Sequence, residues 1–306
     1  MAFVDIENIS KIFPDASGKG SFCVFQDVSF GIEQSEFVTM VGHSGCGKST
    51  ILNIIAGLEE PTTGGVCLGG KQIDGAGLDR MVVFQSFALI PWMSAFDNVK
   101  MAVKSAHRDW DKEQIRAHTE KSLATMGLAG SGDKKPSQLS GGMRQRVGLA
   151  RAFAVGPKML LLDEPFAQID ALTRGVIQDE LVQMWQDTRN TVFMVTHDVD
   201  EAILLSDKIV LMTNGPRARI AEIVEIPIPR PRKRETIIDH PLYYRIRNHL
   251  LHFLIERSSA LQRDDAESDG AHPATIRWDE ALVEPALTAT IAGSGLDATD
   301  GLMAVK

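Results

Sequence analysis

Eight consecutive residues constrain this chain more than any others, because they match the pattern G-x-x-x-x-G-K-[ST] at every position. They read Gly42-His43-Ser44-Gly45-Cys46-Gly47-Lys48-Ser49. A mostly apolar run at 36–42 precedes them, and a stretch with helical spacing that closes at Gly57 follows. A glycine-rich turn between a buried strand and a helix wraps backbone N–H groups around phosphate, and the helix N-terminus adds partial positive charge. The motif predicts a site for the phosphates of a nucleotide.

A second apolar strand supplies acidic groups suited to such a site. It reads Met159-Leu160-Leu161-Leu162-Asp163-Glu164. In phosphoryl transfer on a phosphate loop, a lysine reaches the β- and γ-phosphates, and a serine and an acidic residue hold Mg²⁺. Lys48, Ser49 and Asp163 fit these three roles, with Asp163 acting through water. Glu164 follows directly and is placed to polarise the attacking water as a general base.

The surrounding pattern indicates an α/β fold with a largely parallel sheet. Residues 2–38 alternate apolar and polar positions in short runs, which favours antiparallel strands. From 141 to 216, helical stretches alternate with apolar strands, as in a sheet covered by helices. After 226 the chain becomes rich in proline and basic residues and then forms an amphipathic helical pattern.

Charge and composition narrow the class of partner and the compartment. The 306 residues include 40 acidic and 32 basic ones, so no nucleic acid partner is expected, because duplex binding usually needs a basic face. Three cysteines, an odd number with spacings that fit no zinc pattern, predict free thiols in a reducing compartment. An apolar run of about 18 residues and an apolar signal segment are both lacking, so we expect the chain to stay in the cytoplasm.

A third motif, Leu139-Ser140-Gly141-Gly142-Met143, lies just before the Asp-Glu strand. Taken with Lys48, Asp163 and His197, its order and spacing resemble the ABC ATPases. The resemblance covers residues 1 to about 255 and implies a phosphate-loop NTPase cassette that binds ATP and Mg²⁺. Such a cassette has a mixed central sheet with helices, an antiparallel β subdomain and a helical signature subdomain. In that family the signature of one subunit covers the γ-phosphate held by the phosphate loop of another.

The resemblance assigns further roles one residue at a time. Gln85 resembles the glutamine that meets Mg²⁺ and the attacking water, and His197 resembles the switch histidine that contacts the γ-phosphate. Asp170 resembles the aspartate of the loop that crosses the dimer interface, although Gln168 and Ile169 depart from the small residue and leucine that are commoner there.

An aromatic residue is also implied, to stack on adenine. Phe13 resembles it, although tyrosine is commoner at this place, and Phe22, Phe25 or plain core packing are alternatives. The expected catalytic residues are Glu164, His197, Lys48 and Gln85, and the expected Mg²⁺ ligands are Ser49, Gln85 and Asp163. The expected nucleotide-binding set is Phe13, Gly42, His43, Ser44, Gly45, Cys46, Gly47, Lys48, Ser49, Thr50, Gln85, Ser140, Gly141, Gly142, Asp163 and Asp170.

Two parts are expected along the chain: an ABC ATPase domain at 1–257 and an acidic C-terminal tail at 258–306. The tail holds nine acidic and three basic residues, so it is expected to be flexible or loosely docked, with Trp278 as its anchor. The helical subdomain, about 86–150, resembles the one that receives the coupling helix of a membrane subunit. Trp92 is expected on its surface, with core packing as the alternative.

Four stretches, at 89–93, 170–181, 195–216 and 239–254, resemble the ATP-binding subunits of nitrate/nitrite importers and their cyanate and bicarbonate relatives. The resemblance implies an ATPase that energises import of a small inorganic anion, with nitrate or nitrite as the first expectation. Cyanate/bicarbonate and taurine/sulfonate importer ATPases are the alternatives. A soluble non-transport ABC ATPase is a remote one, and a tail that gates the cassette is another.

The resemblance also implies an assembly and a location. The chain resembles the lean subunit, which lacks a fused solute-binding domain. Its implied partners are a second ATP-binding subunit, identical or different, integral membrane permease subunits and, through the complex, a periplasmic solute-binding protein. The implied location is peripheral, at the cytoplasmic face of the bacterial inner membrane.

Overall fold

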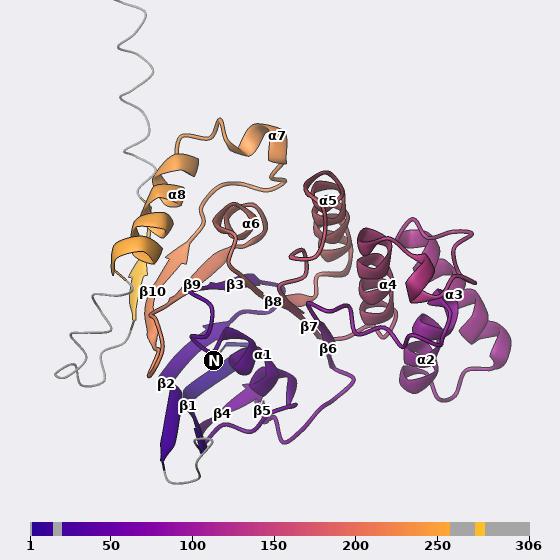
Figure 1. The fold of residues 1–306 in the computed structure, drawn as a ribbon, viewed down its shortest axis with the longest axis horizontal. Coiled ribbons are helices and arrows are strands. Elements are labelled where there is room, and N and C mark those ends of the chain that lie inside the picture. Colours follow the sequence, from indigo (N-terminus) through magenta and orange to yellow (C-terminus); the bar gives the residue numbers. More distant parts are fainter. Residues whose placement is uncertain (1, 15–19, 258–272, 279–306) are drawn as a thin grey trace, which may run out of the picture.

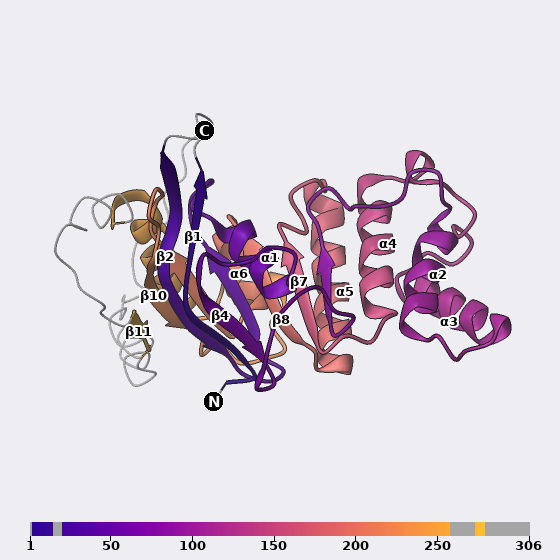
Figure 2. The ribbon, with the colours of Figure 1, turned by 90° about the horizontal axis from the view of Figure 1, so that it is seen from below.

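Two sheets organise the part of the chain that the computed structural model describes, which is residues 2–14, 20–257 and 273–278. Figures 1 and 2 show them with their helices. The first sheet has the strand order β2-β1-β4-β5, and the second has the order β11-β10-β9-β3-β8-β7-β6. The α/β cassette predicted from the sequence is therefore confirmed in its sheets and in its helices.

The smaller sheet is antiparallel and is built from the N-terminal segment. Its strands are β1 (Val4–Pro14), β2 (Ser21–Ile32), β4 (Thr63–Leu68) and β5 (Lys71–Gln72). The antiparallel strands predicted at 2–38 are thus confirmed. The hydrophobic pattern did not predict β4 and β5, which are short, and β4 carries glycine beside its apolar positions.

Five parallel strands form the middle and one end of the larger sheet: β3 (Phe37–Val41), β6 (Arg80–Val83), β7 (Met159–Asp163), β8 (Thr191–Thr196) and β9 (Lys208–Met212). β10 (Ile220–Glu225) joins β9 in the antiparallel direction. Successive side chains of a strand point to opposite faces, so each buried strand feeds two cores. In β3, Phe37 and Val41 belong to one apolar cluster, and Val38 and Met40 belong to the other.

Helices cover both faces of the larger sheet. α1 (Lys48–Ala56) packs with the antiparallel sheet in one cluster, and α5 (Ala171–Thr188) and α6 (Val199–Leu205) pack in the other. All three agree with predicted helices. Within the described ranges, we find no helix with the length and apolarity that crossing a bilayer requires.

A helical segment extends from one end of the molecule (Figures 1 and 2). It contains α2 (Ala95–Ala106), α3 (Lys112–Thr125), a short 3₁₀ turn (Pro136–Gln138) and α4 (Gly141–Phe153). Ser94 caps α2 by accepting from the Asp97 N–H, and Asp111 caps α3 in a capping box with Gln114. The Asp111 cap starts a new helix inside the predicted helical region at 94–130, which explains why that region divides into two helices.

The C-terminal part returns to the edge of the larger sheet. α7 (Arg234–Ile237) leads to α8 (Tyr243–His252), which continues as a π-helical turn (Phe253–Arg257). β11 (Ala274–Ile276) then pairs in parallel with β10, and the Trp278 ring meets the His249 ring edge-on at 5.7 Å. The expected anchoring by Trp278 is found, while 258–272 and 279–306 of the predicted tail lie outside the described residues.

Replacing Trp278 with alanine is expected to lower the melting temperature by about 2–4 °C, because an aromatic contact worth about 1 kcal/mol is lost. Trp278 packs against the large apolar cluster, whereas neighbouring Arg277 is exposed and only pairs with Glu225. Arg277→Ala is therefore the matched control and should melt like the unmodified protein. Calorimetry checks both variants, and equal melting temperatures for the two would contradict the anchoring.

Candidate nucleotide site

The phosphate loop joins β3 to α1 and depends on a glycine with a left-handed backbone. Gly47, the N-cap of α1, has φ 100°. A Cβ at this position would lie 2.7 Å from a ring carbon of Phe25 and 2.8 Å from Val24, so a side chain is excluded both by conformation and by space. The loop is therefore packed against β2, and its backbone continues directly into the first turn of α1.

Lys48 is buried inside this loop. Its ammonium group donates to the carbonyl oxygens of Gly42 at 2.8 Å and His43 at 2.9 Å. His43, Ser44 and Gly45 are exposed on the outer side of the loop. The positive charge of Lys48 is thus held at the loop by two backbone contacts, where an anion would meet it.

Cys46 lies in the same loop but faces the core. Its side chain is fully buried, and burial raises the pKa of the thiol, with the nearby Lys48 ammonium acting in the opposite direction. The thiol therefore stays neutral, and only the backbone of Cys46 is available to a phosphate. As expected, Cys23, Cys46 and Cys67 are all free.

The end of β7 lies beside the start of α1. The Ser49 hydroxyl donates to a carboxylate oxygen of Asp163 at 2.8 Å. Burial raises the pKa of the Asp163 carboxyl, and the hydrogen bond from Ser49 opposes that shift. The two residues that the sequence predicts as Mg²⁺ ligands are therefore adjacent, with hydroxyl and carboxylate oxygens, which Mg²⁺ prefers.

Glu164 leaves the line of β7 through a strained backbone. Its φ is 44°, a left-handed conformation that costs a non-glycine residue about 1–3 kcal/mol. Its N–H donates to the Val195 carbonyl oxygen at 2.9 Å, which holds the turn against the end of β8. Strain of this kind is retained where the surrounding structure fixes it, as the hydrogen bond to Val195 does here.

Three predicted residues meet at the Glu164 carboxylate. The side-chain amide of Gln85 donates to Oε2 at 3.1 Å, and Nδ1 of His197 lies 3.4 Å from the same oxygen. Gln85, Glu164 and His197 follow β6, β7 and β8, which are neighbours in the sheet. Because the carboxyl ends of parallel strands meet at one edge of a sheet, residues far apart in sequence converge here.

The signature residues lie elsewhere. Ser140 is the N-cap of α4, and its hydroxyl accepts from the Met143 N–H at 3.3 Å. A Cβ on Gly142 would lie 2.5 Å from Thr173, so α4 packs closely on α5. In both views α4 and α1 lie apart (Figures 1 and 2). The chain therefore does not bring Ser140, Gly141 and Gly142 to its own phosphate loop.

Asp170 borders the signature on the opposite side of this α4–α5 contact. It is the exposed N-cap of α5, and its carboxylate accepts from the Thr173 N–H at 3.0 Å. That hydrogen bond lowers the pKa of Asp170, so the residue stays ionised. The carbonyl oxygen of Gln168 would lie 3.0 Å from a Cβ on Gly141, so the predicted interface loop and the signature are in contact.

The candidates for adenine stacking are reduced from three to two. Phe25 is 0% exposed and packs on Gly47, so it is not available for a ligand. Phe13 and Phe22 are 38% and 47% exposed and lie opposite each other in the β1–β2 register. Either ring, or both together, offers an aromatic surface at the end of the antiparallel sheet.

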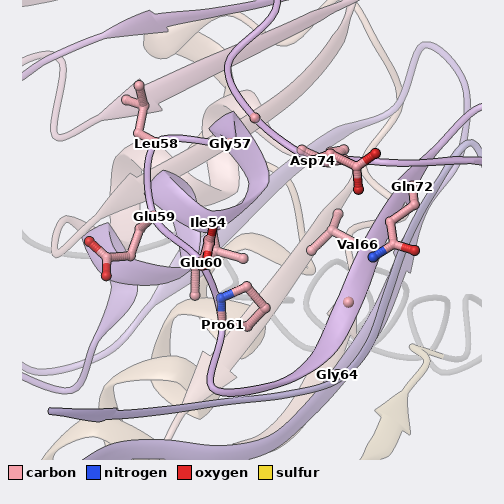
Figure 3. A pocket seen from close by; sticks show the side chains of 13 residues that line it. Ile54, Gly57, Leu58, Glu59, Glu60, Pro61, Gly64, Val66, Gln72 and Asp74 are labelled. Carbon is pink, nitrogen blue, oxygen red and sulfur yellow. The ribbon is translucent and has the colours of Figure 1, made fainter.

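A cavity of about 450 Å³ lies away from these residues, between the end of α1 and strands β4 and β5 (Figure 3). Glu59, Glu60 and Asp74 are among its lining residues. Like charges repel, so acidic walls do not suit a polyphosphate. None of the predicted site residues lines this cavity.

Sequence reasoning missed a buried charged group beside the site. Glu201 in α6 is 7% exposed and interacts with Arg174 of α5. The available signal was an acidic residue in a helix whose remaining positions are almost all apolar. Acidic residues are rarely buried without partners, so this position pointed to a polar contact.

Comparison with known proteins places the chain among cassettes of this type. The ABC transporter family matches residues 25–167. The bicarbonate transport ATP-binding protein CmpD of Synechocystis sp. is 51% identical over 256 residues, covering 84% of this chain and 90% of that protein. The nitrate import ATP-binding protein NrtD of Synechococcus elongatus is 46% identical over 255 residues, covering 83% of this chain and 92% of that protein.

A longer relative and a solved structure complete the comparison. The bicarbonate transport ATP-binding protein CmpC of Synechococcus elongatus is 52% identical over 252 residues, but this chain spans only 38% of its length. An ATP-binding cassette solved as a dimer in a post-hydrolysis state with ADP and Pi has a TM-score of 0.66 and 31% identity. The match covers 73% of this chain and 98% of the solved chain. The chain belongs to the ABC transporter family of ATP-hydrolysing, ATP-binding subunits.

Proposed function

We propose that this chain is the ATP-hydrolysing subunit of an importer for a small inorganic anion, either bicarbonate or nitrate. The supporting observation is the match to CmpD and NrtD over 90% and 92% of their lengths. Both anions are small and trigonal and carry one negative charge. Relatives named for each lie at 51% and 46% identity, so the comparisons support the small-anion class and keep the nitrate expected first from the sequence beside bicarbonate.

The proposed chemistry uses positioning and charge. Lys48 and the backbone of the phosphate loop hold the phosphates, and the α1 N-terminus favours their negative charge. Glu164 polarises the attacking water, and Gln85 and His197 both lie against one oxygen of that carboxylate. No covalent intermediate with the protein is needed, because the reaction proceeds by alignment and charge stabilisation.

Mg²⁺ is proposed as the second cofactor. The Ser49 hydroxyl and the Asp163 carboxylate, 2.8 Å apart, fit a hard cation that takes its other oxygens from phosphate and water. Gln85 is a third proposed ligand, since its amide lies beside Glu164 at the same edge of the sheet. The ion would neutralise charge on the phosphate oxygens.

A second cassette is proposed to complete each site. Ser140, Gly141 and Gly142 lie apart from the phosphate loop of their own chain, while the α4 N-terminus is exposed beside Asp170. A helix N-terminus that faces outward is suited to an anion presented by a partner. The related cassette solved as a dimer supports this arrangement. The partner is a second copy or a homologous subunit.

The membrane partner is proposed to contact the helical segment, about 86–150, of the 1–257 cassette. An apolar cavity of about 380 Å³ lies between β6, α2 and α4, with Leu58, Leu78 and Met101 exposed at it. Nearby in sequence, Trp92 is 73% exposed, so the alternative that it packs in a core is wrong. Exposed apolar side chains favour a protein partner. We therefore propose a peripheral position at the cytoplasmic face of the inner membrane, on a permease that meets a periplasmic solute-binding protein.

Anion-dependent ATPase activity tests the proposal. The chain, purified from native membranes with its bound subunits and reconstituted in vesicles with the solute-binding protein, is expected to hydrolyse ATP several-fold faster with bicarbonate or nitrate than with chloride. Nitrite, cyanate and taurine are assayed in parallel. A membrane complex that responds to none of these anions, or a chain that brings down no permease, would contradict the importer assignment.

A further inference from the structure

A buried carboxylate links α6 to the loop that carries His197. One oxygen of Glu201 accepts from the Thr196 hydroxyl at 2.9 Å, and the other accepts from the Gln178 amide at 2.9 Å. The Thr196 hydroxyl also accepts from the Asp198 N–H at 3.1 Å. Thr196 and Asp198, which flank His197, are therefore joined through the Thr196 hydroxyl. Glu201 orients that hydroxyl by accepting its hydrogen bond.

Arg174 extends this contact to the segment that precedes Asp170. Its guanidinium donates to the Ile169 carbonyl oxygen at 3.2 Å. The same group lies 3.7 Å from a carboxylate oxygen of Asp198 and 4.0 Å from one of Glu201. A single planar cation thus lies between the loop that ends in Asp170 and the loop that contains His197.

The cluster shares a small cavity with the candidate catalytic carboxylate. The cavity has a volume of about 50 Å³, enough for a water molecule, and its walls include Glu164, His197, Arg174 and Glu201. A shift of the Arg174–Glu201 pair would therefore be felt at the walls around Glu164 and His197.

Burial disfavours the charged form of this carboxylate. The pKa of Glu201 is raised to about 7: desolvation and the charge of Asp198 raise it, and together they outweigh the Thr196 hydrogen bond and the charges of Arg174 and His197, which lower it. A buried charge with that balance costs free energy relative to a neutral side chain of the same shape. A costly group that contacts the loops of two site residues is expected to serve the reaction.

We infer that Glu201, with Arg174, is a positioning residue for ATP hydrolysis: it holds the His197 loop in register with the Asp170 loop. The inference rests on the proposed roles of His197 and Glu164. The ionised carboxylate accepts from Thr196 and attracts Arg174, whereas the protonated group loses that attraction. Positioning is therefore strongest above pH 7 and is lost as the pH falls through that value.

Glu201→Gln, in the reconstituted transporter, tests the inference by its pH profile. At pH 8 we expect kcat for ATP to fall roughly tenfold with KM within about twofold, because a displaced loop affects the reaction more than binding. The ratio of wild-type to variant kcat should shrink toward pH 6, where the wild-type carboxyl is protonated. Glu222→Gln removes another buried carboxylate, which pairs with His249 at 2.7 Å in the C-terminal part, and should leave kcat unchanged.

Thermal stability separates positioning from a structural role. The pKa of Glu201 is raised in the folded state, so the protonated form is favoured by folding and wild-type stability declines as pH rises through about 7. Glu201→Gln, which carries no charge, should melt no lower than wild type at pH 8 while it turns over more slowly. A variant that loses kcat and melting temperature together, or one that keeps the wild-type pH profile, would overturn the inference.

A third variant separates failure of the positioning inference from failure of the role proposed for His197. His197→Ala should be slow if the assigned role of His197 holds. If His197→Ala hydrolyses ATP slowly while Glu201→Gln hydrolyses it at the wild-type rate, only the positioning role of Glu201 is refuted. A wild-type rate in His197→Ala would refute the assigned role of His197 itself, on which the inference rests.

Discussion

Glu164→Gln is expected to slow ATP hydrolysis by about 10²- to 10⁴-fold, the contribution typical of a general base, while ATP still binds. Glutamine keeps the size of the side chain and an oxygen that can accept from Gln85, so the site should keep its shape. What it loses is the negative charge that polarises water. Phosphate release measured at saturating ATP, together with equilibrium binding of ATP, checks both parts of this expectation.

The same chemical change at an exposed position provides the control. Glu120 in α3 pairs with Arg116 at 2.8 Å, and both side chains are more than half exposed. Glu120→Gln should hydrolyse ATP at the wild-type rate, because exposed ion pairs contribute little. If Glu164→Gln also turned over normally, the base would have to be another group, and the role proposed for Glu164 would be withdrawn.

The sequence was most informative where the chemistry is local. The phosphate loop needs a left-handed glycine next to a helix start, so its residues are contiguous and the sequence alone identifies Gly47. The strand ending in Asp163 and Glu164 is equally local. The convergence of Gln85 and His197 on Glu164 was implied by family resemblance, because strand order in a sheet does not follow from the pattern of a single strand.

Long-range packing determined what the sequence left open. Phe25 is a phenylalanine like Phe13 and Phe22, and only its burial against Gly47 excludes it as an adenine-stacking residue. Cys46 belongs to the loop motif, yet its thiol faces the core. Glu201 and Arg174 are charged residues in ordinary helical patterns, and their meeting requires α5 and α6 to be packed side by side. The pairing of β11 with β10 joins segments that no local pattern connects.

Lys48→Ala is expected to lower the affinity for MgATP by about 10- to 100-fold, because a charge-assisted hydrogen bond of about 1.5–3 kcal/mol is removed. Hydrolysis at saturating ATP should fall by a further 10²- to 10³-fold, since the ammonium also meets the charge that develops in the reaction. Glu164→Gln, in contrast, should retain binding. Calorimetric titration with ATP and phosphate release at several ATP concentrations separate the two effects.

Cys46→Ala shows whether such losses come from the charge or from the shape of the loop. Its side chain is buried in the same loop, and a Cβ on Gly42 would lie 3.0 Å from its sulfur. Removing the sulfur leaves a small void, so stability should decrease while MgATP affinity stays within about twofold, because the backbone donors remain. If both variants lost affinity equally, the cause would be a collapsed loop. Full affinity in Lys48→Ala would mean that the phosphates bind away from this loop.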